Sequence, residues 1–207
     1  PPPTPVPSTD ALNIATYWGS SGNANDYIPI ISDIDPRYNI LVLSFINFDQ
    51  HNKLVYCSNC NVGSNPCADP PQPTIKCSKH YNFQGKSFTN SGDIVVNTVF
   101  KNDIAEFKKK PDPYGRRRMV MVSFGGANGT TFLDNADAAH TAILAFLNKY
   151  DLDGIDIDLE SGALSSSSIP EVLRRLKADG YKISAVPEPT RSTLDPIVTA
   201  DKSGRSI

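Results

Sequence analysis

Asp153-Gly154-Ile155-Asp156-Ile157-Asp158-Leu159-Glu160 is the stretch that decides the predicted fold. Side chains of a β-strand point alternately to its two faces, so Asp156, Asp158 and Glu160 would share one face. The aliphatic residues between them would share the other face and pack beneath helices. Carboxylates this close cannot all ionise, so the pKa of at least one must rise. A carboxyl group that keeps its proton near neutral pH can act as a general acid on a sugar or ester oxygen.

The other interpretations of these acids are a solvated strand edge and a metal site without catalysis. An exposed strand would not need an unbroken aliphatic partner face. Loops that bind hard cations usually break the alternation with glycine and asparagine. We therefore expect no metal here, and the acids are interpreted as catalytic.

The acidic stretch also resembles a known family. The D-x-x-D-x-D-x-E signature of glycoside hydrolase family 18, the chitinase family, is matched by Asp153, Asp156, Asp158 and Glu160. In that family the signature lies on the fourth strand of the barrel. The resemblance implies a (β/α)8 TIM barrel that hydrolyses chitin, with no cofactor.

Three further blocks support the resemblance and come in the family's order. Ser123-Phe124-Gly125-Gly126 is similar to the S-x-G-G of the family's third strand. Tyr17-Trp18-Gly19 resembles the end of the first strand in the short, plant-type chitinases, and Ala185-Val186-Pro187-Glu188 resembles the fifth strand. Together the four blocks cover the chain from roughly residue 11 to 195.

Strands and helices alternate along the chain as in a parallel α/β sheet. We predict strands at 12–18, 38–48, 118–123, 153–160 and 181–186, and helices at 102–109, 135–150 and 168–179. A complete barrel of this kind runs to ~250 residues. About five βα units of eight are therefore present, as in a truncated or partial barrel. Two alternatives to truncation are that a partner supplies the remaining βα units, or that the chain forms a divergent open α/β sheet.

Three local patterns sharpen the helix predictions. In the second helix Ala139, Ile143, Phe146, Leu147 and Tyr150 lie at helical spacing, with Asp134 or Asn135 as N-cap. In the first helix the inward residues would be Ile104, Ala105 and Phe107. Ser168 and Glu171 form a capping-box pattern for the third helix, which Gly180 would end.

Composition gives the outer bounds. The 207 residues are 39% hydrophobic with a formal net charge of -2, as in one ordinary globular domain, which argues against nucleic acid as a partner. No apolar run approaches the ~20 residues of a membrane span. Residues 1–10 are rich in Pro, Thr and Ser and would form an extended linker, or else a frayed terminus. The catalytic domain would then occupy residues 11–207. We expect the protein to be secreted to the cell exterior. The linker would suit a tethered carbohydrate-binding module.

A polar insertion at about 49–91 contains every cysteine of the chain: Cys57, Cys60, Cys67 and Cys77. Four thiolates could bind zinc, or a secreted protein would oxidise them to two disulfides. The second C-x-x-C of a zinc ribbon is absent, because nine residues separate Cys67 and Cys77. We favour two disulfides, with all three pairings open.

Site roles follow from the resemblance. Glu160 would protonate the glycosidic oxygen, Asp158 would orient the substrate's N-acetyl group, and Asp156 would share the proton balance with Asp158. Substrate-binding candidates are Tyr17, Phe45, Ser123, Gly125, Gly126, Ala185 and Glu188. For Trp18, sugar contact and core filling are equally open. The family's carbonyl-positioning tyrosine on its sixth strand has no counterpart in this sequence.

The predicted function is hydrolysis of β-1,4-linked N-acetylglucosamine polymers by a substrate-assisted retaining mechanism. An endo-β-N-acetylglucosaminidase acting on N-glycans has nearly the same signature. A non-catalytic chitin-binding or sugar-binding relative and a structural or inhibitory protein are further alternatives. Expected partners are chitin or its oligosaccharides and a C-terminal barrel segment.

Overall fold

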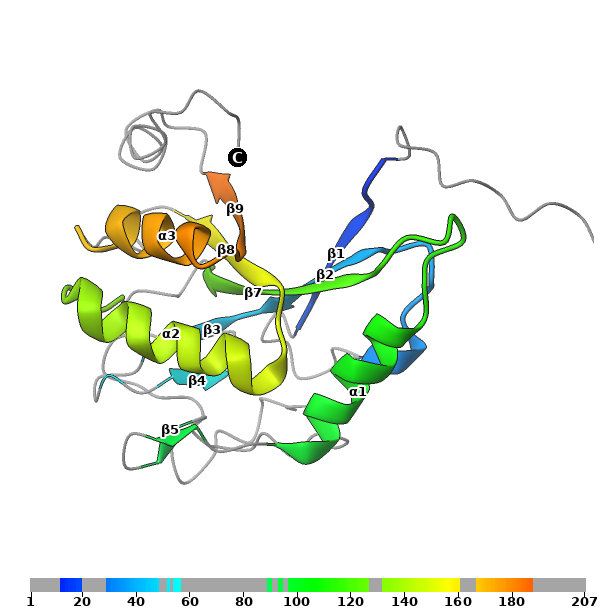
Figure 1. Cartoon of the computed structure of the whole chain (residues 1–207), viewed down its shortest axis with the longest axis horizontal. Coiled ribbons are helices and arrows are strands. Elements are labelled where there is room, and N and C mark those ends of the chain that lie inside the picture. The colour runs from blue at the N-terminus through cyan, green and yellow to red at the C-terminus, as the bar shows by residue number, and fades with distance from the viewer. Residues whose placement is uncertain are drawn as a thin grey trace, which may run out of the picture.

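A parallel five-stranded sheet forms the centre of the computed structural model, which describes residues 12–19, 29–48, 52, 54–56, 89–90, 93–94, 97–126, 132–160 and 167–187. The sheet order β1-β2-β7-β8-β9 follows the order of the strands along the chain. The strands are β1 (Ala15–Trp18), β2 (Ile40–Ser44), β7 (Met119–Gly125), β8 (Gly154–Leu159) and β9 (Lys182–Pro187). Within the described residues β1 and β9 are its two edges, so the sheet is an arc of a barrel that does not close (Figure 1). The prediction of five parallel strands in a partial barrel is confirmed.

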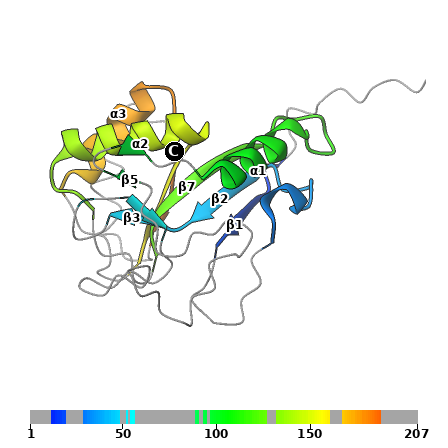
Figure 2. The same ribbon diagram turned by 90° about the horizontal axis from the view of Figure 1, so that it is seen from below.

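The helices that connect the strands cover one side of the sheet (Figure 2). They are α1 (Thr98–Lys109), α2 (Ala136–Tyr150) and α3 (Ile169–Ala178), and a short 3-10 helix, η1 (Ile31–Asp33), precedes β2. Two small antiparallel pairs lie outside the sheet: β3 (Ile46–Phe48) with β4 (Leu54–Tyr56), and β5 (Thr89–Asn90) with β6 (Asp93–Ile94). No helix in the described part of the chain is both long and apolar enough to cross a bilayer.

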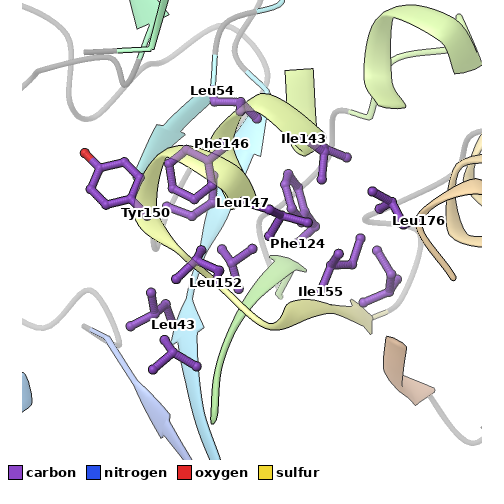
Figure 3. Close-up of a cluster of buried hydrophobic side chains, with 14 of the residues drawn as sticks. Leu43, Leu54, Phe124, Ile143, Phe146, Leu147, Tyr150, Leu152, Ile155 and Leu176 are labelled. Carbon is purple, nitrogen blue, oxygen red and sulfur yellow. The ribbon is translucent and has the colours of Figure 1, made fainter. Parts of the chain in front are cut away.

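The hydrophobic core lies between the sheet and these helices (Figure 3). On β8, Ile155 and Ile157 are fully buried and point toward the helices, as the alternation of the strand predicts. Phe124 of β7 lies in the same layer. Burial of one such side chain contributes about 1.5–3 kcal/mol, so this layer holds the acidic strand in place.

Helix α2 agrees closely with the sequence. Asn135 is its N-cap, and its side chain accepts a hydrogen bond from the Ala138 amide at 3.0 Å. The five residues predicted to face inward are all buried. Asp151, at φ 54°, ends the helix in the left-handed conformation and turns the chain into β8.

Helix α1 begins four residues earlier than predicted. Asn97 caps it by accepting a hydrogen bond from the Phe100 amide at 3.0 Å. Ile104 and Phe107 are buried as expected, but the prediction that Ala105 faces inward is wrong, because it is exposed. Phe100 completes the buried face instead, and its ring lies 5.8 Å from that of Trp18.

The single second strand predicted at 38–48 is also wrong. Strand β2 ends at Ser44, and the chain leaves the sheet across a cis Ser44–Phe45 peptide to form β3. Buried Asn47 of β3 hydrogen-bonds the backbone of Gly125 instead of continuing the sheet. A continuous apolar run does not show where its sheet partner changes.

The capping box predicted for α3 does not form. The Ser168 backbone is already helical and its side chain makes no cap hydrogen bond; its Oγ donates to the Leu133 carbonyl. Glu171 pairs with Arg174 and Arg175. Gly180, at φ 94°, follows the helix as predicted.

Several predictions lie outside the described residues. They concern the linker at 1–10, the four cysteines of the insertion, and Glu188. The two disulfides and the domain limits therefore stay predictions.

Candidate active site

A row of polar residues crosses four neighbouring strands on the face opposite the helices. The parallel register places Ser44 of β2 beside Ser123 of β7, Ser123 beside Asp156 of β8, and Asp156 beside Ser184 of β9. Adjacent strands lie about 4.8 Å apart, so short side chains at one level reach their neighbours. The acid cluster is thus built on rigid strands.

Asp156 is held by three hydroxyl groups. Ser123 Oγ donates to its Oδ2 at 2.7 Å, Tyr17 Oη donates to the same oxygen at 3.2 Å, and Ser184 Oγ donates to Oδ1 at 2.5 Å. Asp156 as a whole residue is 1% exposed. Burial and the charge of Asp156 raise the pKa of Tyr17 above its ordinary value, so the phenol keeps the proton that it donates.

Asp158 is the carboxyl group whose proton affinity changes most clearly. Burial, then the charges of Glu160 and Asp156, raise its pKa from 3.8 to about 6, and a side-chain hydrogen bond with Glu160 adds to the shift. In the described part of the chain no lysine or arginine forms an ion pair with it. The expectation that one pKa of the cluster must rise is met at Asp158.

Glu160 directly follows the last residue of β8 and is exposed. Asp156, Asp158 and Glu160 therefore form a gradient from the buried sheet to its carboxyl end, where barrel enzymes carry their reactive groups. A proton shared by Asp158 and Glu160 lies beside solvent, because Glu160 is exposed. Chemically, this arrangement can deliver a proton to an oxygen atom of a bound molecule.

Two glycines bring the backbone of β7 close to Asp158. A Cβ atom at Gly125 would lie 2.0 Å from the carbonyl oxygen of Asp158, and the Gly126 amide donates to that oxygen at 3.1 Å. Both glycines have positive φ, 115° and 79°. A Cβ at Gly126 would lie 2.7 Å from the ring of Phe45, so Phe45 is also beside this turn.

Other predicted site residues lie elsewhere. Ala185 pairs with Ile157 on the helix-covered face and packs against the hydrophobic core, away from the acids. Trp18, for which two interpretations were open, is 2% exposed, and its Nε1 donates to the Pro29 carbonyl at 2.7 Å. It therefore belongs to the core.

Sequence reasoning missed two polar residues. Ser184 is a hydroxyl residue in an otherwise apolar segment, and its register with Asp156 could have been inferred only from an aligned parallel sheet. Asn47 accepts from the Gly125 amide at 3.0 Å and donates to its carbonyl at 3.2 Å. It appears in the sequence as one polar residue within a buried run. Among the described residues no three His, Cys, Asp or Glu side chains are arranged to hold a metal ion.

Comparisons with known proteins point to one family. No protein-family model matches the chain. The acidic endochitinase of Cicer arietinum is 23% identical over 197 residues, which cover 88% of this chain and 55% of that protein. Chitinase ChiA of Flavobacterium johnsoniae is 34% identical over 85 residues, which cover 37% of this chain and 5% of that protein.

Among solved structures, a family GH18 chitinase from Chromobacterium violaceum matches with a TM-score of 0.57 and 20% identity. The match covers 91% of this chain and 47% of that structure. The chain thus spans at most 55% of the length of each of these three proteins. The resemblance to glycoside hydrolase family 18 is therefore confirmed, and the chain has the fold of part of that family's catalytic barrel.

Proposed function

We propose that this chain is part of a secreted family 18 glycoside hydrolase that cleaves chitin, the polymer of β-1,4-linked N-acetylglucosamine. The three relatives above are chitinases by name. The observation that carries the proposal is the pairing of Asp158 with Glu160. A carboxyl group with a pKa of about 6 is hydrogen-bonded to an exposed carboxyl group at the end of a barrel strand.

In the proposed reaction Glu160 is the general acid. It gives its proton to the glycosidic oxygen as the bond from that oxygen to the anomeric carbon breaks. The carbonyl oxygen of the substrate's own N-acetyl group forms a bond to the anomeric carbon, which makes an oxazolinium ion. Family 18 is a known exception to the scheme with a carboxylate nucleophile. Water then attacks the anomeric carbon from the face that the leaving group left, gives a proton to Glu160 and opens the oxazolinium ring, so the product retains its configuration.

Asp158 would accept a hydrogen bond from the N–H of the N-acetyl group and stabilise its developing positive charge. The raised pKa supports this role, because the proton shared by Asp158 and Glu160 can move to Glu160 when Asp158 binds the amide. Asp156, fixed by Ser123 and Tyr17, would supply a nearby negative charge. Each step uses a group on β8 or hydrogen-bonded to it.

The test compares two proteins on two substrates. The 207-residue chain and a longer version that contains the complete barrel are incubated with chitin oligosaccharides and with N-glycans, and products are identified by mass. We expect shorter N-acetylglucosamine oligomers from the longer version and little product from the 207-residue chain. Substrate-assisted attack requires accurate placement, since an error of about 1 Å costs roughly a hundredfold in rate.

The other outcomes separate the alternatives. Release of N-glycans without chitin cleavage would replace the proposal by an endo-β-N-acetylglucosaminidase. Binding of chitin oligosaccharides without any product would indicate a non-catalytic sugar-binding protein. Proton NMR of the first product determines its anomer, and an α product from a β linkage would exclude the retaining mechanism.

A further inference from the structure

Ser184 of β9 is a polar residue at the acid cluster to which the proposed mechanism gives no role. It lies in register with Asp156 and is part-buried, and its Oγ donates to Asp156 Oδ1 at 2.5 Å. On the other side of Asp156, Ser123 of β7 lies in the same register. The carboxyl group is therefore flanked by one serine from each neighbouring strand.

The two oxygen atoms of Asp156 have different donors. Ser123 and Tyr17 both donate to Oδ2, whereas the structure shows one donor to Oδ1 among the described residues, which is Ser184. The terminal torsion of an aspartate is soft and turns both oxygen atoms together, so donors on both oxygens restrict it more than donors on one oxygen. Ser184 supplies the donor to Oδ1.

The orientation of Asp156 matters because Asp158 lies two residues away on the same face. Three ionisable groups face Asp158: Asp156 on β8, Glu160 directly after β8, and Tyr17 on β1, which contacts the cluster through Asp156. Asp158 shares a side-chain hydrogen bond with Glu160, and the negative charge of Asp156 raises the pKa of Asp158. The hydroxyl donors around Asp156 stabilise that charge, which favours a proton on the Asp158–Glu160 pair.

We propose that Ser184 is a positioning residue that fixes the Asp156 carboxylate, stabilises its negative charge and thereby keeps a proton on the Asp158–Glu160 pair. The proposal deepens the proposed function and rests on it for its catalytic consequence. Its structural consequence, the proton affinity of Asp158, does not depend on activity. The two parts can therefore be tested separately.

The catalytic test uses the longer version that contains the complete barrel. We expect Ser184→Ala to lower kcat about tenfold to a hundredfold, with KM within about twofold, because a misplaced carboxylate and a less firmly held proton affect the transition state more than substrate binding. Ser184→Thr keeps the hydroxyl and should restore kcat to within about threefold of the unchanged protein. Tyr181→Phe is the matched control, since it removes a hydroxyl near the same strand that bonds Asn148 Oδ1 at 2.8 Å, away from the acids.

The structural test follows the carboxyl carbons of the 207-residue chain by ¹³C NMR as pH is varied. In Ser184→Ala the titration midpoint of Asp158 should fall, because Asp156 loses a donor that stabilises its negative charge, and that charge is one cause of the raised pKa of Asp158. If Ser184→Ala does not fold, Ser184→Cys replaces it, because a thiol is a weak donor of nearly the same shape.

The outcomes distinguish this proposal from the proposed function. An Asp158 midpoint that stays unchanged in the variant overturns the positioning role, whatever the activity of the longer version. A lowered midpoint together with an inactive longer version supports the positioning role and contradicts the chitinase proposal. A loss of kcat in Ser184→Thr equal to that in Ser184→Ala would also overturn the positioning role.

Discussion

The two ends of β8 use the same residue type in opposite ways. At the start of the strand, Asp153 is surrounded by cations and donors: Lys108 Nζ lies 3.2 Å from its Oδ2, Arg117 Nη2 lies 2.6 Å from its Oδ1, and the Val120 amide donates to Oδ2 at 2.8 Å. At the other end, Asp158 faces Glu160 and Asp156, and its pKa rises to about 6. Both acids belong to one eight-residue motif.

The difference shows that the neighbours of an acid decide its role. Asp153 joins the start of β8 to β7 and to helix α1, where its charge is compensated. Asp158 is buried, and the acids Glu160 and Asp156 lie near it without a cation among the described residues, so its pKa rises to about 6. A motif that matches at four positions therefore contains an acid held by cations and a hydrogen-bonded pair of acids.

The largest effect is expected at the reactive end. In the longer version with the complete barrel, Glu160→Gln should lower kcat by about 10²–10⁴-fold, because the amide keeps the shape of the side chain but cannot deliver a proton. Binding of chitin oligosaccharides, measured by calorimetry, should change little. Turnover comparable to that of the unchanged protein would remove Glu160 from the acid role.

At the structural end the expected loss is one of stability. Asp153→Ala should lower the free energy of unfolding by roughly 1–3 kcal/mol, because it leaves the Val120 amide without its acceptor, while Lys108 keeps its pair with Asp151. Urea denaturation of the chain measures the change. The control is Glu106→Ala, which removes an exposed pair with Lys109 and should cost under about 1 kcal/mol. Equal losses of unfolding free energy in Asp153→Ala and Glu106→Ala would contradict the structural role of Asp153.

The pH dependence of stability tests Asp158. Its pKa is 3.8 ordinarily and about 6 in the folded chain, so between these values the folded chain binds more protons than the unfolded chain. Stability contributed by this group is therefore present at low pH and is lost as pH rises from about 4 to about 6, by at most about 3 kcal/mol. Asp158→Asn should flatten the dependence in urea unfolding at pH 4.5 and 7. An equally steep dependence in the variant would show that another group causes it.

The smallest expected effect separates the two cations of Asp153. Arg117 has a side chain 68% exposed, whereas that of Lys108 is 8% exposed. Arg117→Ala should therefore cost under about 1 kcal/mol, and less in high salt. A loss as large as that of Asp153→Ala would mean that Arg117 contributes most of the stabilisation of this end.

The sequence by itself determined most of the scaffold and the identity of the acids. Alternation of acids with Ile155 and Ile157 predicted the two faces of β8, and the helical spacing of buried residues predicted α2, because both are set by the local period of the backbone. The same period predicted that Asp156 and Asp158 share a face. None of this requires knowledge of distant contacts.

Tertiary structure decided the partners of those residues. Three features depend on contacts between separate segments of the chain. They are the end of β2 at Ser44, the hydrogen bonds of Asn47 to Gly125, and the buried position of Trp18. Ser184 contacts Asp156 only because parallel pairing brings β9 beside β8 in one register. Which carboxyl group holds the proton also depends on burial and on neighbouring charges. The sequence supplies the acids, but the free energy of ionisation of each acid depends on its burial and on the charges around it.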